Sequence, residues 1–419
     1  MPHAGNVSLA VEFWEWVCHA IRPVAEGGIR GLRWAYVLVG VADGTLLPFI
    51  PLYLVQRGLT AGGVGAVLSA SALAALAGGL GWAYLADRRV RPERLVVAAT
   101  GGAALAALLL PVAGGAAAMT AAIVLLTIVR SPLALLDPIT LRRLRLTTRT
   151  DYARIRLRMS AGWTASALTS GALYQVGGLR LIPFIYVPLS LLAGAWMWHA
   201  VKPEPRAVED DAARPAVRVP AVPLPMVGFL VACLLLGVSL AATQNFLVLQ
   251  INYLGGGALL IGAAAAFQST TEIPTMGYTH VLTRRISHRV LFMVGCAIYL
   301  VIFVAWAFTA SAFVAALLKL FVGVAFALTF VAAVMIANDL TPSRLRATGQ
   351  ALVKSVLFGV APIAGSLGGG IVYGSLGPRA MFLGATVAVA AAGALAVIAA
   401  PSRKQAAAGE AGTVAPQPA

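Results

Sequence analysis

Apolar stretches, each close to the length that spans a bilayer, recur along the whole chain. A helix needs about 20 mostly apolar residues to cross the hydrocarbon layer, and twelve stretches meet this requirement. They cover residues 34–56, 62–86, 95–115, 117–140, 157–177, 180–200, 225–250, 257–282, 290–309, 311–337, 350–374 and 379–400. The pattern predicts an all-α membrane protein with twelve transmembrane helices.

The polar segments between these stretches divide the chain into two equal halves. Residues 1–33 are too polar to span and predict a cytoplasmic interfacial segment. The proline-rich residues 201–224 predict a flexible cytoplasmic linker between six-helix bundles at 34–200 and 225–400. The low-complexity residues 401–419 are expected to form a disordered cytoplasmic tail.

Composition and charge agree with a membrane location. Of the 419 residues 60% are hydrophobic and 11% are charged, against about 25% charged in soluble domains. The net charge of +16 is concentrated on one side of the predicted membrane, where 25 Lys and Arg residues lie, against Arg57, Arg180 and Arg379 on the other. By the positive-inside rule both termini are cytoplasmic. The charge therefore reports topology in a bacterial cytoplasmic membrane and does not indicate a nucleic-acid partner.

Motifs for catalysis or cofactor binding are missing from the sequence. There is no Walker A sequence, no nucleophile–base arrangement and no cluster with metal-ligand spacing. Cys18, Cys233 and Cys296 are far apart and match no redox or metal pattern. We expect no cofactor, no metal and no enzymatic activity.

Two internal similarities indicate a duplication. The segment from Gly81 to Arg89 resembles the segment 196 positions later, and Gly171-Ala-Leu-Tyr174 resembles Gly370-Ile-Val-Tyr373 at an offset of 199. Both pairs fall at equivalent places in the two predicted bundles. Parallel repeats of this kind are the architecture of major facilitator transporters.

The chain resembles the major facilitator superfamily over residues 30–400. After the second predicted helix, Asp87 and Arg88 match the core of the superfamily's G-x-x-x-D-R-x-G-R-R signature, although both glycines are missing. The resemblance implies a monomeric secondary transporter with two six-helix pseudo-repeats, which carries a small organic solute by alternating access. It also implies that Asp87 and Arg88 brace the cytoplasmic gate.

A narrower resemblance lies in the fifth predicted helix. The segment from Asp151 to Trp163 is similar to the stretch shared by lactose permease and the phenylpropionate-permease-like symporters, and Glu272 has a similar counterpart there. The resemblance implies that Arg156 binds substrate and that Trp163 stacks on it. Residues 290–309 carry no charge and residues 311–337 carry only Lys319, so lactose specificity and the lactose permease coupling scheme are not expected.

Charged residues inside membrane helices are costly and usually face a cavity or pair with one another. Asp43 and Arg130 both lie near mid-depth. Asp43 is predicted to carry a proton, with Arg130 as its partner or as a substrate anchor, and a fixed structural ion pair is the equal alternative. Asp137 and Arg156 are candidates for a substrate clamp or inner gate, unless Arg156 is only a cytoplasmic anchor.

Glu272 is the preferred proton carrier, because a carboxylate away from water can exchange a proton as its surroundings change. The alternative is an ion pair with Lys319 or Lys354, which are otherwise assigned to gating or structure. Trp163 is either a stacking surface or a packing residue. Asn245 and Gln268 are candidate hydrogen-bonding partners of the solute.

Gln244 is adjacent to Asn245 on one helix, and only one of the two is expected to line the cavity. Together these features predict proton-coupled symport of a hydroxylated or carboxylated organic solute through the lipid bilayer. The alternatives are proton-antiport efflux of a drug or secondary metabolite, a non-transporting receptor or scaffold, and a lipid-acting membrane protein.

Overall fold

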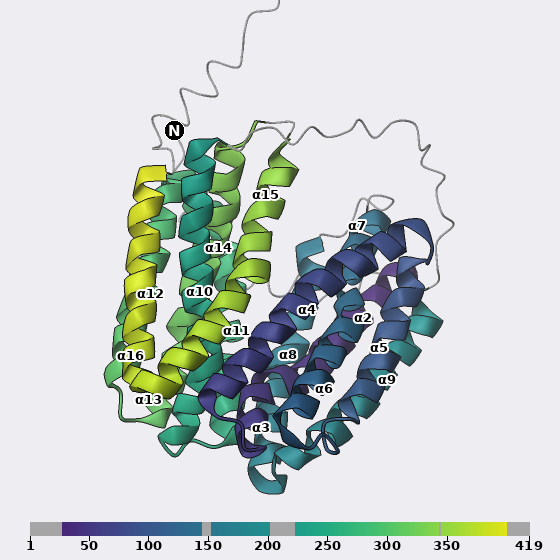
Figure 1. The fold of residues 1–419 in the computed structure, drawn as a ribbon. Helices are drawn as coiled ribbons and strands as arrows, with labels where there is room; N and C mark the ends of the chain where they lie inside the picture. Colours follow the sequence, from purple (N-terminus) through teal and green to yellow (C-terminus); the bar gives the residue numbers. More distant parts are fainter. Residues whose placement is uncertain (1–26, 145–151, 202–222, 343–344, 400–419) are drawn as a thin grey trace, which may run out of the picture.

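The computed structural model describes residues 27–144, 152–201, 223–342 and 345–399, which form helices joined by short turns (Figure 1). The linker is described only at its two edges. Most of the N-terminal segment and the tail also lie outside the described residues, so their predicted character stays a prediction.

The first half contains eleven helical elements in sequence order. They are α2 (Gly27–Leu46), η1 (Leu47–Phe49), α3 (Ile50–Gln56), α4 (Ala61–Arg88), α5 (Pro92–Ala107), α6 (Gly115–Arg130), η2 (Ser131–Leu135), α7 (Leu136–Leu144), α8 (Tyr152–Gly177), η3 (Leu179–Leu181) and α9 (Ile182–Ala200).

The second half follows the same plan with fewer breaks. Its elements are α10 (Leu224–Tyr253), α11 (Ala258–Arg285), α12 (His288–Phe308), α13 (Ala312–Leu317), α14 (Lys319–Asp339), α15 (Arg346–Ser355), the π-helical segment η5 (Val356–Val360) and α16 (Ala361–Ala399).

The prediction of an all-α fold with twelve membrane helices is confirmed. Eight stretches of the described residues are long and apolar enough to span a membrane. The last, Thr348–Ala399, is 52 residues long and bends at Gly377, so it holds two predicted helices. The other three are α5, which is short, and α8 and α11, which carry polar and charged residues.

Prolines explain why several predicted helices are broken within the membrane. Pro48 and Pro51 follow α2, and Pro132 follows α6; at each place the α-helix gives way to a 3₁₀ turn. Proline removes a backbone donor and clashes with the preceding turn. The breaks leave the overall course of both rods intact, because α3 and α7 continue beyond them.

Equivalent aromatic contacts support the internal duplication. Phe49 meets Tyr174 edge to face with ring centroids 4.9 Å apart, and Phe246 stacks on Tyr373 with centroids 5.4 Å apart. The phenylalanines are separated by 197 positions and the tyrosines by 199. The two halves therefore use the same ring pair at the same place.

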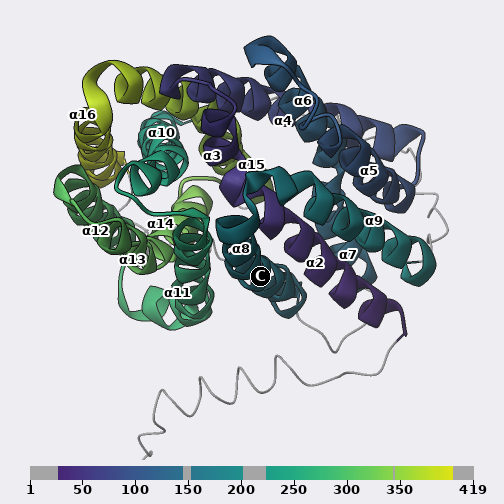
Figure 2. The same cartoon turned by 90° about the horizontal axis from the view of Figure 1, so that it is seen from below.

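The halves meet along two helix pairs, α4 with α16 and α8 with α11, as Figure 2 shows from below. Glycines allow the backbones to approach closely. A Cβ atom added to Gly262 would lie 2.1 Å from the Ala167 carbonyl oxygen, and one added to Gly65 would lie 2.5 Å from the Ser366 carbonyl oxygen. We call these contacts the glycine seam; they lie near the first residues of α4 and α11.

Candidate functional site

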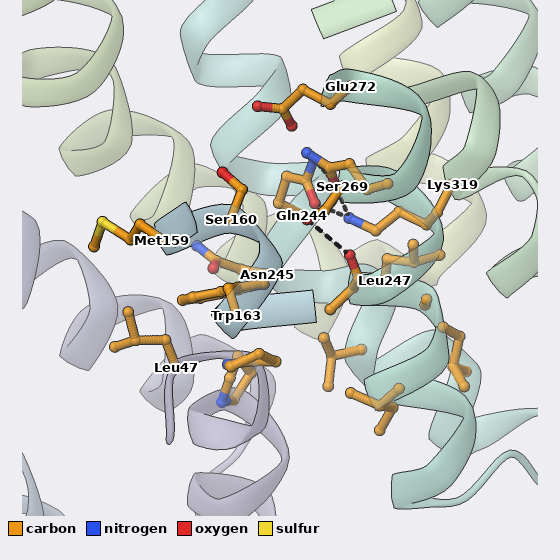
Figure 3. Close-up of a pocket in the computed structure, with 18 residues that line it drawn as sticks. Leu47, Met159, Ser160, Trp163, Gln244, Asn245, Leu247, Ser269, Glu272 and Lys319 are labelled. Carbon is orange, nitrogen blue, oxygen red and sulfur yellow. Dashed lines mark hydrogen bonds between the residues drawn. The ribbon is translucent and has the colours of Figure 1, made fainter. Parts of the chain in front are cut away.

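A cavity of about 460 Å³ lies between the two halves (Figure 3). The first half contributes residues from η1, α3 and α8, and the second half contributes residues from α10, α11 and α14. Its main polar lining residues are Trp163, Gln244, Asn245, Gln268, Glu272 and Lys319. The structure thus brings four of the predicted solute-binding and proton-coupling residues to one place: Trp163, Asn245, Gln268 and Glu272.

Lys319 is the central charged group of this cavity. It is the first residue of α14, directly after the break at Leu318, and only 7% of it is exposed. Its Nζ atom donates a 2.7 Å hydrogen bond to Oε1 of Gln268 and another to Oε1 of Gln244. Gln244 Nε2 also donates to Gln268 Oε1 at 3.1 Å. Sequence reasoning assigned Lys319 to gating or structure, whereas the structure places it in the cavity wall.

Gln244 and Asn245 both line the cavity, so the prediction that only one would do so is wrong. Successive helix residues point about 100° apart, and the cavity is wide enough to meet both directions. Asn245 Nδ2 donates to Ser366 Oγ of α16 at 3.0 Å, while Gln244 turns toward Lys319.

Glu272 lies one helical turn after Gln268 on α11 and extends into the same cavity. No cation of the described chain comes within 4.0 Å of its carboxylate, so the predicted alternative of an ion pair is not formed here. Lys354 is exposed on α15 and does not line the cavity. The charged and titratable groups that face Glu272 are Lys319, Arg156 and Tyr299.

A second cavity, of about 400 Å³, lies within the first half. It contains the ion pair of Asp43 and Arg130, in which Arg130 Nε donates to Asp43 Oδ1 at 2.9 Å. Asp43 is 2% exposed, and Tyr186 lies beside Arg130. The sequence did not show that these helices meet; the structure shows that they do.

Arg156 and Asp137 also pair in this second cavity. Arg156 Nη1 lies 3.1 Å from Oδ1 and 3.0 Å from Oδ2 of Asp137, and the Tyr36 hydroxyl donates to Oδ1 at 2.7 Å. Arg156 and Trp163 therefore share α8 but line different cavities, and Met159 between them lines both. Tyr36 was missed from sequence, although it precedes Asp43 by seven residues, two turns along one helix face.

An aromatic cavity of about 260 Å³ was also missed. Phe326, Phe330 and Phe358 line it, together with Gln244 and Gln268 from the polar cluster. The ring centroids of Phe326 and Phe330 are 5.8 Å apart. Aromatic residues are ordinary in membrane helices, and nothing in their spacing distinguishes this group.

The predicted gate residues Asp87 and Arg88 end α4 and are exposed. The Arg88 guanidinium lies over the ring of Tyr84, 5.0 Å from its centroid. Their role in gating stays a prediction.

Comparison with known proteins gives one family and several solved structures. The MFS_1 like family model matches residues 30–384. The nucleoside transporter NupG has a TM-score of 0.73 at 16% identity, covering 88% of this chain and 97% of its own. A bacterial metal transporter has a TM-score of 0.66 at 14% identity, covering 90% and 99%.

The human organic anion transporter MFSD10 (TETRAN) has a TM-score of 0.56 at 14% identity, covering 90% of this chain and 100% of its own. At these identities the likeness concerns the fold. No curated protein matches the sequence.

Proposed function

This chain belongs to the MFS_1 like family and is a multi-pass secondary transporter, and we propose that it carries a small organic solute together with protons by alternating access. The narrower likeness to the lactose permease and phenylpropionate-permease-like symporters forms part of this proposal. The solute site in this proposal is the 460 Å³ cavity between the halves.

The cavity lining supports a polar solute with a flat or ring-shaped part. Trp163 offers an aromatic face, and the amides of Asn245, Gln244 and Gln268 offer donors and acceptors. A hydroxylated or carboxylated solute would satisfy such groups. Because a nucleoside transporter shares the fold, a nucleoside is one of the solutes to test.

The observation that carries the proton coupling is the position of Glu272. It is a carboxylate inside the central cavity, with no ion-pair partner within 4.0 Å in the described chain. Asp43, in contrast, is held by Arg130 away from that cavity. We therefore assign the proton to Glu272 and give the Asp43–Arg130 pair a structural role.

The direction of opening follows from the glycine seam. The seam lies near the first residues of α4 and α11, which the charge distribution places on the external side. A seam closed there leaves the central cavity accessible from the cytoplasm. We propose that the structure represents the inward-facing state.

The test uses purified full-length protein in liposomes that contain a pH-sensitive dye. Uridine, gluconate and benzoate are added outside in turn, and solute uptake and internal pH are followed together. Symport predicts that a transported solute acidifies the interior. Uptake without a pH change would contradict proton coupling, and alkalinisation of the interior would indicate antiport.

A further inference from the structure

Lys319 holds a positive charge that the described protein does not neutralise at close range. Its two hydrogen-bond acceptors, Gln244 and Gln268, are neutral amides. No carboxylate of the described residues lies within 4.0 Å of its Nζ atom. A buried charge without a counter-ion is costly, so the site favours a ligand that supplies one.

The other membrane charges discussed above have close counter-ions. Arg130 has Asp43, and Arg156 has Asp137. An anionic solute would have to displace a carboxylate to reach either arginine. At Lys319 it has only to add a charge-assisted hydrogen bond through the remaining donor of the ammonium group.

We infer that the solute carries an anionic group, such as a carboxylate, which binds Lys319 in the central cavity. The inference rests on the proposed function and names the class of its solute. Trp163 and Asn245 line the same cavity and are available to the rest of the molecule. Arg156, which the family resemblance favours as the substrate anchor, remains with Asp137.

Glu272 makes the binding of this anion depend on a proton. With Glu272 ionised, its charge balances Lys319 across the cavity, and an added anion leaves one negative charge in excess. With Glu272 protonated, the anion balances Lys319 and the cavity is neutral. The anion and the proton therefore favour each other's binding, and this coupling is reciprocal. Arg156 and Tyr299 also face Glu272, but Arg156 is already paired with Asp137.

The test measures the affinity of purified full-length protein for matched pairs of probes by titration calorimetry. The pairs are benzoate with benzamide and gluconate with gluconamide, which differ in charge and little in shape. We expect at least one carboxylate to bind about tenfold more tightly than its amide. Equal affinities within both pairs, or no binding of either carboxylate, would overturn the inference.

Two variants locate the charge. Lys319→Gln should reduce carboxylate affinity about tenfold or more, while Arg180→Gln, which removes an exposed charge between α8 and α9, should leave it unchanged. Unchanged affinity in Lys319→Gln would also overturn the inference. Should Lys319→Gln fail to fold, Glu272→Gln provides the second measurement. It should retain carboxylate binding at alkaline pH, where the wild type weakens, and parallel pH profiles would count against the inference.

The outcomes separate this inference from the proposed function. Proton-coupled uptake of uridine without binding of either carboxylate would leave the symporter intact and remove the anion site. Carboxylate binding that requires Lys319, with uptake but no proton movement, would leave the anion site and remove the coupling.

Discussion

Arg130 donates from Nε to Oδ1 of Asp43 at 2.9 Å, which joins α6 to α2 although the residues are 87 positions apart. Asp43 is almost fully buried. The pair is the deepest polar link described within the first half, and this position suggests that it holds the bundle together.

Asp43→Asn should destabilise the protein strongly, because it leaves the Arg130 guanidinium in the membrane without a counter-ion. Breaking such a pair costs about 3 kcal/mol or more. The apparent melting temperature of purified protein in one detergent measures this loss. The double variant Asp43→Leu with Arg130→Met should recover much of it, since neither charge remains. An unchanged melting temperature in Asp43→Asn would refute the structural role.

Glu272→Gln should abolish solute accumulation against a gradient, because the amide cannot carry a proton. Exchange between equal pools should survive in part, since the cavity keeps its shape. Uptake and counterflow in liposomes measure the two activities, and Glu272→Asp, which keeps an acid, is the control. Wild-type accumulation in Glu272→Gln would move the coupling role to Asp43.

Trp163→Ala should raise the KM for uptake by about tenfold, because the solute loses its stacking surface. Trp163→Tyr keeps an aromatic face and should change the KM only slightly. Both are measured at matched amounts of protein in the membrane. Equal values for Ala and Tyr would identify Trp163 as a packing residue.

Arg156→Lys should weaken solute affinity, because lysine lacks the planar fork that holds Asp137 through both carboxylate oxygens. The measurement is the KM for uptake, with Arg154→Lys on the same helix as the control. A purely cytoplasmic anchor would tolerate lysine, since the positive-inside rule counts both residues alike. Normal affinity in Arg156→Lys would reduce the family likeness of α8 to a marker without function.

Gly262→Ala should shift the protein away from the inward-facing state. Its added methyl group would meet the Ala167 carbonyl oxygen at 2.1 Å, whereas Gly384→Ala meets nothing within 4 Å and serves as the control. A cysteine at Ser160, in a background without the native cysteines, reports the change through labelling by a membrane-impermeant maleimide.

Labelling of Ser160→Cys should come from the cytoplasmic side and become stronger from outside when Gly262→Ala is added. The sides are assigned by reporters fused after Arg206, expected in the cytoplasm, and between Gly178 and Leu181, expected outside. Identical labelling in both glycine variants would show that the seam does not control access.

Hydropathy predicted the membrane helices well because every span must be apolar over a fixed length. It did not predict where helices break, because a break changes hydrogen bonding and leaves the hydropathy of the window unchanged. The fifteen-odd residues after Pro92 illustrate this: the predicted helix extends to residue 115, but α5 ends at Ala107. The turn that follows contains Pro111 and the positive-φ Gly115, two signals that were available.

The site was predicted less completely, because pairing depends on how helices pack. Sequence placed Lys319 within a span, but its contact with Gln268 joins residues 51 positions apart. The same limit applied to Asp43 and Arg130. Which residues are charged and how deep they lie can be predicted from one sequence, whereas the choice of partner arises only in the packed bundle.

The π-helical segment Val356–Val360 has a consequence for comparing this chain with others. A π-turn contains one more residue than an α-turn, and each residue rotates a helix by about 100°. Ser366 therefore owes its direction toward Asn245 to that extra residue. A relative whose helix is α-helical throughout should be one residue shorter at this point. An alignment that places no gap there would match the inner face of one helix with the outer face of the other.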